Sequence, residues 1–191
     1  AHYVDALIGE ADIFVDLHSG GRTLRFLPYV MTRLTPRTPQ AANMAALHAF
    51  GAPVAVVAGP EREERYAWSS AERRGIPCLT GEFGGSGQLS IEGLRIVERG
   101  VHNVLVHMGI LRADAIPAPP TRVLASRGRT FSPDNGMFEP HFDVGDTVEA
   151  GALGGLVHYF DDPLREPRPV HLVHSGTVIS MHHSGLTRRG D

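Results

Sequence analysis

Hydrophobic and polar positions divide the chain into two parts of different character. Up to about residue 115, short apolar runs alternate with segments in which apolar residues recur at helical spacing. We predict strands over residues 12–18, 53–59 and 76–85, and helices over residues 38–51, 65–75 and 91–108. Such alternation is typical of an α/β domain in which helices cover both faces of a mainly parallel or mixed sheet.

The first strand and the last helix have the clearest patterns. The run "DIFVDLH", residues 12–18, is mostly apolar, as expected of a central strand buried on both faces. Ser90 is a suitable N-cap for the helix. The apolar residues after it recur at i, i+3 and i+4 and are predicted to form one buried face: Ile91, Leu94, Val97, Val101, Val104, Leu105 and Met108.

The pattern changes at "IPAPPTR", residues 116–122, where three prolines within four residues predict a stiff, extended linker. Beyond it no helical periodicity remains, and short β-type runs are separated by turns such as "PDNG" and "VGD". Short strands with frequent turns predict a small β-sandwich or barrel. We therefore predict an α/β domain over residues 1–116 and an all-β domain over residues 117–191.

Composition excludes several kinds of chemistry. The chain contains no lysine, so all 18 basic residues are arginine, which excludes a lysine Schiff base, a P-loop lysine and a lysine-borne carrier arm. The net charge of -3 gives no electrostatic footprint for nucleic acid, and no apolar run approaches the length of a membrane span. The single cysteine, Cys78, lies in an apolar run and is predicted to be a small buried hydrophobe. It fits a reducing compartment, and we expect the cytoplasm.

The first candidate site lies where the strand at 12–18 ends, in "DIFVDLHSGG". Asp16 and His18 are two residues apart, so their side chains leave the same face of the strand. Ligands of α/β sheets bind at the carboxyl ends of strands. A metal-bound histidine commonly gives its other ring nitrogen to a carboxylate, so Asp16 is a candidate to orient His18, and the following glycines are expected to leave room for a ligand. A solvated histidine at a strand end is the alternative.

The second candidate is Glu82 in "TGEFGGSG", which also ends an apolar strand before a glycine cluster. A carboxylate in such a position can have a raised pKa and act as a general base toward a metal-bound water. An exposed loop glutamate is the alternative. A catalytic zinc needs about three protein ligands, and the sequence contains neither an HExxH nor a CxxC motif.

The segments "DLHSGG" and "EFGGSG", in this order and followed by β-type runs after "PAPP", resemble the succinylglutamate desuccinylase/aspartoacylase family, relatives of the zinc carboxypeptidases. The resemblance covers nearly the whole chain and is closest to the branch of N-acetyl-diaminobutyrate deacetylases. It implies a zinc-carboxypeptidase-like fold, here partial, and a zinc-dependent deacylase of small N-acyl amino acids. His18 matches a zinc ligand. Glu82 matches the general base that takes a proton from the zinc-bound water and returns it to the leaving amine.

The resemblance also implies ligands that this chain does not contain. The family's first two zinc ligands, a histidine and a glutamate, lie in an upstream G-x-H-G-x-E segment, which is absent here. The chain opens on "AHYVDALIGEAD", which is typical of the end of a helix, and we expect both ends of the chain to be cut. One zinc ion per full-length chain is therefore expected, and weak or no zinc binding and no activity in these 191 residues.

Arg22 and Arg25 follow the His18 turn and are candidates to hold a substrate carboxylate by bidentate pairing, with ordinary surface arginines as the alternative. The expected partner is a small N-acyl amino acid, without nucleic acid or membrane, and a homo-oligomer stays open. Two other functions also stay open: a non-catalytic binding or scaffold module that keeps the fold, and a metallo-carboxypeptidase.

The turns "VGDTVEAG" and "SGTVIS" make the second domain resemble the biotinyl/lipoyl carrier fold. A working carrier needs an attachment lysine at a hairpin tip, which this chain lacks. The carrier function is thereby excluded, while the carrier-like fold stays a prediction. We expect this domain to wall the active-site cleft or to mediate assembly.

Overall fold

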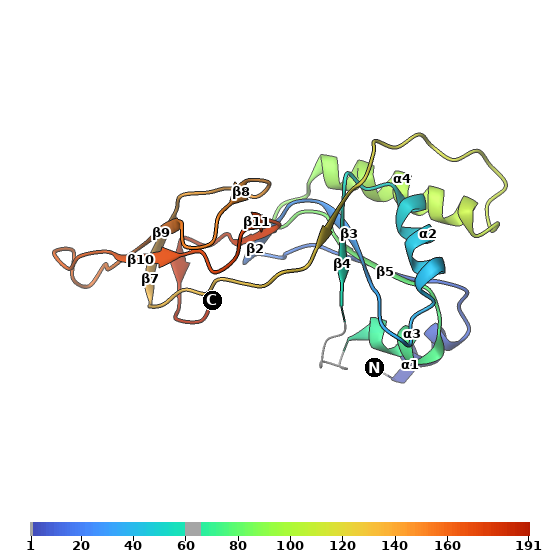
Figure 1. The fold of residues 1–191 in the computed structure, drawn as a ribbon, viewed down its shortest axis with the longest axis horizontal. Coiled ribbons are helices and arrows are strands. Elements are labelled where there is room, and N and C mark those ends of the chain that lie inside the picture. The colour runs from blue at the N-terminus through green and yellow to red at the C-terminus, as the bar shows by residue number, and fades with distance from the viewer. Residues whose placement is uncertain (1, 60–65) are drawn as a thin grey trace. The chain divides into compact units, whose positions relative to one another are not determined.

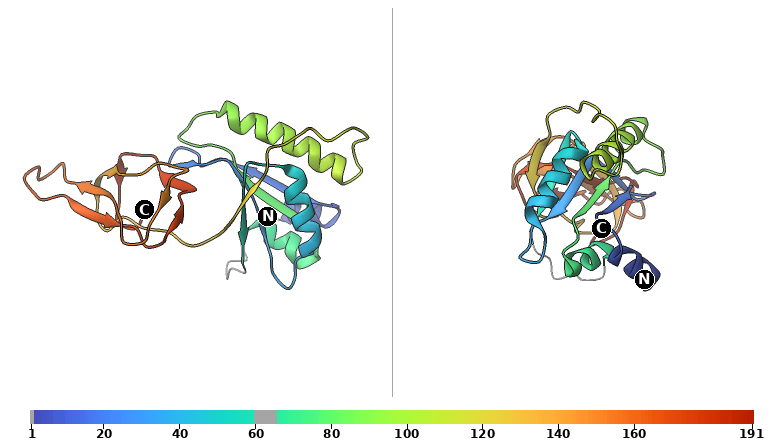
Figure 2. Two further views of the ribbon diagram at one scale, coloured as in Figure 1. Left: turned by 45° about the horizontal axis from the view of Figure 1, so that its top comes forward. Right: turned by 90° about the vertical axis from the view of Figure 1, so that its right-hand side faces the viewer.

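The computed structural model describes residues 2–59 and 66–191, which form two compact units (Figures 1 and 2). The first unit comprises the described parts of residues 1–19, 28–83 and 89–126, and the second comprises residues 20–27, 84–88 and 127–191. None of the helices in the described residues is both long enough and apolar enough to cross a membrane.

A five-stranded mixed sheet forms the centre of the first unit. Its strands, in spatial order, are β1 (Phe14–His18), β5 (Cys78–Glu82), β3 (Tyr29–Arg33), β4 (Val54–Ala58) and β6 (Arg122–Ala125). All neighbours pair in parallel except β5 and β3. Strands β1 and β5 therefore run in one direction, and the other three run in the opposite direction. The predicted mainly parallel or mixed sheet is confirmed.

Helices cover both faces of this sheet, as predicted. They are α1 (His2–Gly9), α2 (Gln40–Phe50), α3 (Ala67–Arg74) and α4 (Ile91–His107). Helices α2 and α4 pack together, as do α1 and α3 (Figure 1). Leu79 of β5 belongs to the apolar cluster with Leu47 and Phe50, whereas its neighbour Cys78 belongs to the cluster with Ile8. Adjacent residues of β5 thus face opposite layers. The first residue of the predicted helix at 65–75 lies outside the described residues.

Helix α4 begins as predicted, but the face that it buries agrees only in part with the predicted one, with Val104 buried and Val97 and Met108 packed against the core. The Ser90 Oγ accepts a hydrogen bond from the Gly93 N–H at 3.0 Å. Of the predicted apolar face, Ile91 and Leu94 are exposed, and the residues that α4 buries are Gly93, Ile96, Gly100, Asn103 and Val104. The reason is close approach, because a Cβ on Gly100 would overlap the Phe50 ring. The small residues set the helix face, and several larger apolar residues remain outside.

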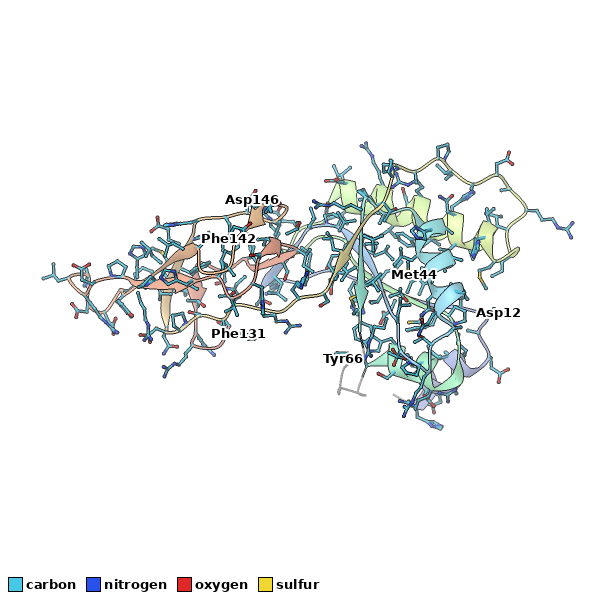
Figure 3. All side chains as sticks on the ribbon, in the orientation of Figure 1. Asp12, Met44, Tyr66, Phe131, Phe142 and Asp146 are labelled. Atoms are coloured by element: carbon cyan, nitrogen blue, oxygen red, sulfur yellow. The ribbon has the colours of Figure 1, made fainter. Side chains whose placement is uncertain are left out.

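Strand β1 lies at the edge of this sheet, so the prediction of a central strand buried on both faces is wrong for the described residues. Leu17 is 40% exposed. An apolar groove of about 440 Å³ runs beside the strand, lined by Ala11, Asp12, Ile13, Val15, Leu17, Val101, Val104, Leu105 and Ile110. Asp12, at the start of this stretch, is labelled in Figure 3. Val101 and Leu105 of α4, which were predicted to be buried, are only partly buried and line this groove.

Strand β3 is central in the sheet, yet sequence analysis placed no strand there. Tyr29, Val30, Thr32 and Arg33 are all buried. The sequence pattern did not predict this strand, because it is short and ends in Arg33. Arginine is seldom buried without a partner. That partner comes from a distant helix and is described below.

The second unit consists of antiparallel strands. Its four-stranded sheet has the order β10 (Arg168–His171), β9 (Leu153–His158), β7 (Gly136–Pro140) and β13 (Leu186–Thr187). Two further pairs join β11 (Gly176–Thr177) to β8 (Thr147–Val148), and β12 (Ser180–His182) to β2 (Leu24–Phe26). The resemblance to a biotinyl/lipoyl carrier stays a prediction.

The boundary between the units differs from the predicted one at 116/117. Strand β6 lies beyond the proline-rich linker, yet it pairs with β4 in the first sheet, from Val54↔Arg122 onward. The linker itself is fastened to α4, because the Asn103 side chain donates to the Ile116 carbonyl at 2.9 Å and accepts from its N–H at 2.7 Å. The chain therefore completes the first sheet before it enters the second unit at residue 127.

We expect Gly100→Ala to destabilise the protein, although alanine is the better helix former by about 1 kcal/mol. The added methyl group would overpack the contact with Phe50, which typically costs about 1–3 kcal/mol. Chemical denaturation should show a lower free energy of unfolding, and in a Phe50→Leu background the loss should shrink because the smaller side chain leaves space. A gain in stability in the otherwise unchanged protein would contradict this packing.

Candidate active site

The register of the first sheet places His18 and Glu82 side by side. Strands β1 and β5 are parallel and aligned residue for residue, from Phe14↔Cys78 to His18↔Glu82. The pairing continues one step further, where the Phe83 N–H donates to the His18 carbonyl at 3.0 Å. The structure therefore brings the two candidates together at the carboxyl ends of two neighbouring strands.

Asp16 contacts the imidazole of His18 from the same strand. The His18 Nε2 lies 2.9 Å from the Asp16 Oδ1, and the two side chains are 51% and 31% exposed. A carboxylate in this position favours the tautomer that carries its proton on Nε2. The other ring nitrogen, Nδ1, makes no hydrogen bond to any described residue. It is the atom that is free to bind a metal ion.

Glu82 is half-buried beside this pair. Its Oε2 is buried and has no hydrogen-bond partner among the described residues. Burial raises the pKa of the Glu82 carboxyl above its ordinary value, against the lowering effect of His18 and together with a raising effect of Asp16. An unpaired buried carboxylate oxygen costs free energy, and a raised pKa brings a carboxylate closer to the range in which it works as a general base.

The two candidate arginines belong to the second unit, unlike His18 and Glu82. The Arg25 Nη2 forms an ion pair with the Asp143 Oδ1, and this contact lowers the pKa of the Asp143 carboxyl. Arg22 is exposed and has no hydrogen bond or ion pair with any described residue. Arg22 therefore retains its full capacity to bind an anion, and Arg25 does not.

The residues present fit only part of a zinc site. Within residues 2–59 and 66–191, no group of three or more His, Cys, Asp or Glu side chains is arranged to hold a metal ion. His18, with its free Nδ1 and its carboxylate partner, has the chemistry of one ligand. A catalytic zinc takes about three protein ligands, so the described residues do not complete the set.

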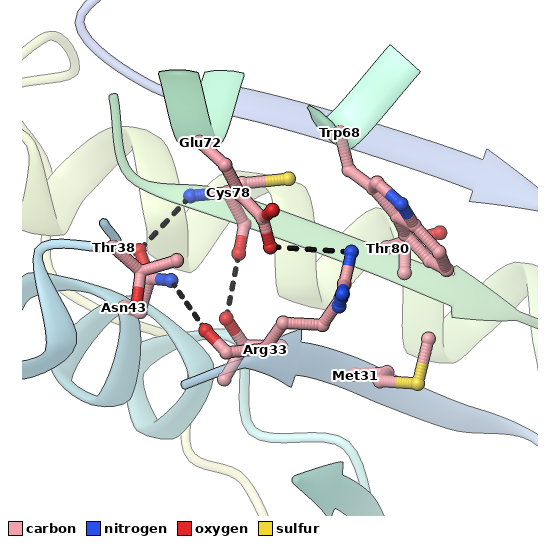
Figure 4. Close-up of a pocket in the computed structure, with 9 residues that line it drawn as sticks. Met31, Arg33, Thr38, Asn43, Trp68, Glu72, Cys78 and Thr80 are labelled. Atoms are coloured by element: carbon pink, nitrogen blue, oxygen red, sulfur yellow. Dashed lines mark hydrogen bonds and ion pairs between the residues drawn. The ribbon is translucent and has the colours of Figure 1, made fainter. Parts of the chain in front are cut away.

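A second polar cluster, in the core of the first unit, is too small to hold a substrate (Figure 4). Its cavity is about 10 Å³, which is the space of one water molecule. Arg33 is the buried charge of β3, and its Nη1 lies 3.3 Å from the Glu72 Oε1 of α3. The Arg33 guanidinium also lies 5.4 Å from the centre of the Trp68 ring. These contacts explain how an arginine occupies a core strand.

Cys78 lines the same cavity and is not a nucleophile. The residue is buried, and burial raises the pKa of its thiol to about 12. The thiolate, which is the reactive form, is therefore negligible at neutral pH. The prediction of a small buried hydrophobe is confirmed.

Comparison with known proteins gives consistent results. Residues 1–108 match the model of the succinylglutamate desuccinylase/aspartoacylase catalytic domain. A curated relative, the N-alpha-acetyl-L-2,4-diaminobutyric acid deacetylase of Halomonas elongata, is 32% identical over 162 residues, which are 82% of this chain and 47% of the relative.

Solved structures of similar proteins cover the whole chain. The succinylglutamate desuccinylase/aspartoacylase from Rhodobacter sphaeroides is 34% identical with a TM-score of 0.90, over 100% of this chain and 60% of that one. The product-bound ectoine utilization protein EutE (DoeB) from Ruegeria pomeroyi is 34% identical with a TM-score of 0.91, over 100% and 59%. The chain thus spans about half to three fifths of the length of these relatives.

Glu82→Gln should stabilise the fold at neutral pH but not in acid. A carboxyl group whose pKa is raised by folding favours the folded state only while it is protonated, and this contribution is lost as the pH rises from the unfolded-state value of 4.5 through the raised folded-state pKa. The neutral amide avoids that loss. Thermal unfolding with a chelator present should show a melting temperature for the variant that exceeds the wild-type value by a few degrees at most at pH 7, since about 1 kcal/mol corresponds to about 2–4 °C for a chain of this size.

The matched control is Glu98→Gln, which replaces an exposed glutamate of α4. Its effect on the melting temperature should be the same at pH 7 and at pH 4. A melting temperature of Glu82→Gln that is lower than wild type at pH 7 and equal to it at pH 4 would refute the account of Glu82.

Proposed function

Because the chain belongs to the succinylglutamate desuccinylase/aspartoacylase family, we propose that it works as a zinc-dependent hydrolase that cleaves the amide bond of a small N-acyl amino acid. One observation supports the proposal most strongly. The Asp16–His18 pair lies beside Glu82, whose buried oxygen has no partner among the described residues, at the carboxyl ends of β1 and β5. The name of the Halomonas relative supports N-acetylated diaminobutyrate as the first substrate to test.

His18 is proposed to supply one zinc ligand through Nδ1, while Asp16 keeps the ring in the tautomer and orientation that this requires. The remaining ligands are not among the described residues. When bound, zinc would polarise the amide carbonyl and make a water molecule more acidic.

Glu82 is proposed to move the proton. Amide hydrolysis adds water across the C–N bond, so one proton must leave the water and one must reach the amine nitrogen. A single carboxylate can take the first and deliver the second, and the raised pKa of Glu82 suits this exchange. Arg22 is proposed to pair with the substrate carboxylate, since its guanidinium has no partner among the described residues.

The direct test replaces the base in the protein as encoded. Glu82→Ala should lower kcat for N-acetyl-L-2,4-diaminobutyrate by about 10²–10⁴-fold, the usual contribution of a general base, with an unchanged circular dichroism spectrum. Glu98→Ala, which removes an exposed carboxylate of α4, should leave kcat unchanged.

Two outcomes of this experiment would contradict the proposal. If Glu82→Ala keeps its activity, Glu82 is not the general base. If the wild-type protein cleaves no N-acyl amino acid, a binding or scaffold module is favoured. Cleavage of C-terminal residues from peptides in preference to N-acyl amino acids would favour a metallo-carboxypeptidase.

Zinc binding provides a separate prediction. Asp16→Asn should weaken zinc binding by the protein as encoded about 10–100-fold, because the ring of His18 loses the carboxylate that orients it. His18→Ala should weaken it further, and Asp12→Asn, an exposed carboxylate just before β1, should have no effect. The isolated 191 residues should bind less than one zinc ion per chain. Competition with a chelator measures the zinc affinity of the three variants and of the 191 residues. Tight binding of one zinc ion per chain in His18→Ala would rule out His18 as a zinc ligand.

A further inference from the structure

The two loops that continue from the candidate catalytic strands belong to the second unit. Only Ser19 separates His18 from the loop of residues 20–27, and only Phe83 separates Glu82 from the loop of residues 84–88. Loops beyond the carboxyl ends of strands are the segments that contact ligands in α/β sheets. The conformation of these two loops therefore bears on the proposed reaction.

The loops are paired with each other through their backbones. The Gly20 N–H donates to the Gly84 carbonyl at 3.2 Å, and the Ser86 N–H donates to the Leu24 carbonyl at 3.0 Å. A Cβ on either Gly20 or Gly85 would overlap the Leu24 carbonyl oxygen. Gly20 was expected to leave room for a ligand, but in the structure it lets its own loop fold back on Leu24, and Gly85 lets the second loop pack closely against the first.

Strands near the C-terminus hold this loop pair in place. Strand β2 of the first loop pairs antiparallel with β12, with Arg25 opposite Met181. Backbone hydrogen bonds extend the contact on both sides, from the Leu27 N–H to the Ile179 carbonyl at 2.9 Å and from the His183 N–H to the Thr23 carbonyl at 2.8 Å. The two loops are thus part of the second unit, and the first of them is paired with β12.

One side-chain contact fastens the loop to a different part of that unit. Arg25, in the middle of β2, forms its ion pair with Asp143, which lies in the turn after β7. The Asp143 carboxylate also accepts a hydrogen bond from the Val144 N–H at 2.6 Å, which fixes its orientation. The guanidinium is thereby committed to a carboxylate of its own unit.

Resting on the proposed function, we propose that Arg25 is a positioning residue: its ion pair with Asp143 holds the loop that follows His18 in the conformation that the reaction needs. The second unit then acts on catalysis through this loop. Arg25 does not bind the substrate carboxylate, which leaves that role to Arg22.

The ion pair is exposed, which makes the proposal separable from a purely structural role. The two side chains are 40% and 58% exposed, and exposed pairs contribute little to global stability. Breaking the pair should therefore loosen the loop, while the fold and the pairing of β2 with β12 stay intact. If Arg25 only supported the fold, its loss would lower the melting temperature at the same time as it sped up hydrogen exchange in the loop.

The test is a double-mutant cycle in the protein as encoded, with Arg25→Met, Asp143→Asn and the two combined. Each single variant should lower kcat/KM by about three- to five-fold, mainly through kcat. The combined variant should be no worse than either single variant, because residues that act as a pair are not additive. Hydrogen exchange of the peptides that contain residues 20–27 and 84–88 should speed up equally in all three variants, with the melting temperature nearly unchanged. Arg165→Met breaks another ion pair of the second unit, with Asp134, and should alter neither rate nor loop exchange.

Two results would overturn the proposal. If Arg25 binds substrate directly, Arg25→Met raises KM while Asp143→Asn leaves kcat/KM unchanged. If the ion pair does not hold the loop, hydrogen exchange stays at the wild-type rate in every variant. Failure of the proposed function would be visible separately, because hydrogen exchange reports on the loops in a protein with no activity.

Discussion

The parallel pairing of β1 with β5 is the constraint on which the candidate site depends. A shift of this pairing by one residue would turn every side chain of β1 to the opposite face. The observed register agrees with the two apolar clusters, because Phe14 packs with its partner Cys78 on one face of the sheet and Val15 packs with its partner Leu79 on the other. With that register, His18 lies opposite Glu82, and Asp16 lies within reach of the imidazole.

The backbone pairing also continues beyond the sheet, into the two chain segments that belong to the second unit. Past His18 and Glu82, the backbone of the same two chain segments keeps exchanging hydrogen bonds, from Gly20 to Gly84. There the segments belong to the second unit. The loops that follow His18 and Glu82 therefore belong to a different unit from the residues that are proposed to carry the chemistry.

Local patterns were sufficient for much of this arrangement. Strand and helix alternation predicted the layered sheet, Ser90 predicted the start of α4, and the polar ends of two apolar runs marked His18 and Glu82 as candidate site residues at strand ends. The errors involve partners that are distant in sequence. Arg33 concealed a core strand because its partner, Glu72, lies on a helix far along the chain. The short run Leu24–Phe26 gave no sign that its pairing partner is Ser180–His182.

The measurement that tests the central claim most directly is the pH dependence of kcat/KM on the acid side, in wild type and in Glu82→Gln. If Glu82 takes the proton from water, the wild-type rate falls as the pH drops through the raised pKa of this carboxyl group. The account predicts that the much smaller residual rate of Glu82→Gln shows no such fall over the same range. An acid limb that is unchanged in position and steepness in Glu82→Gln would contradict the assignment of Glu82 as the base.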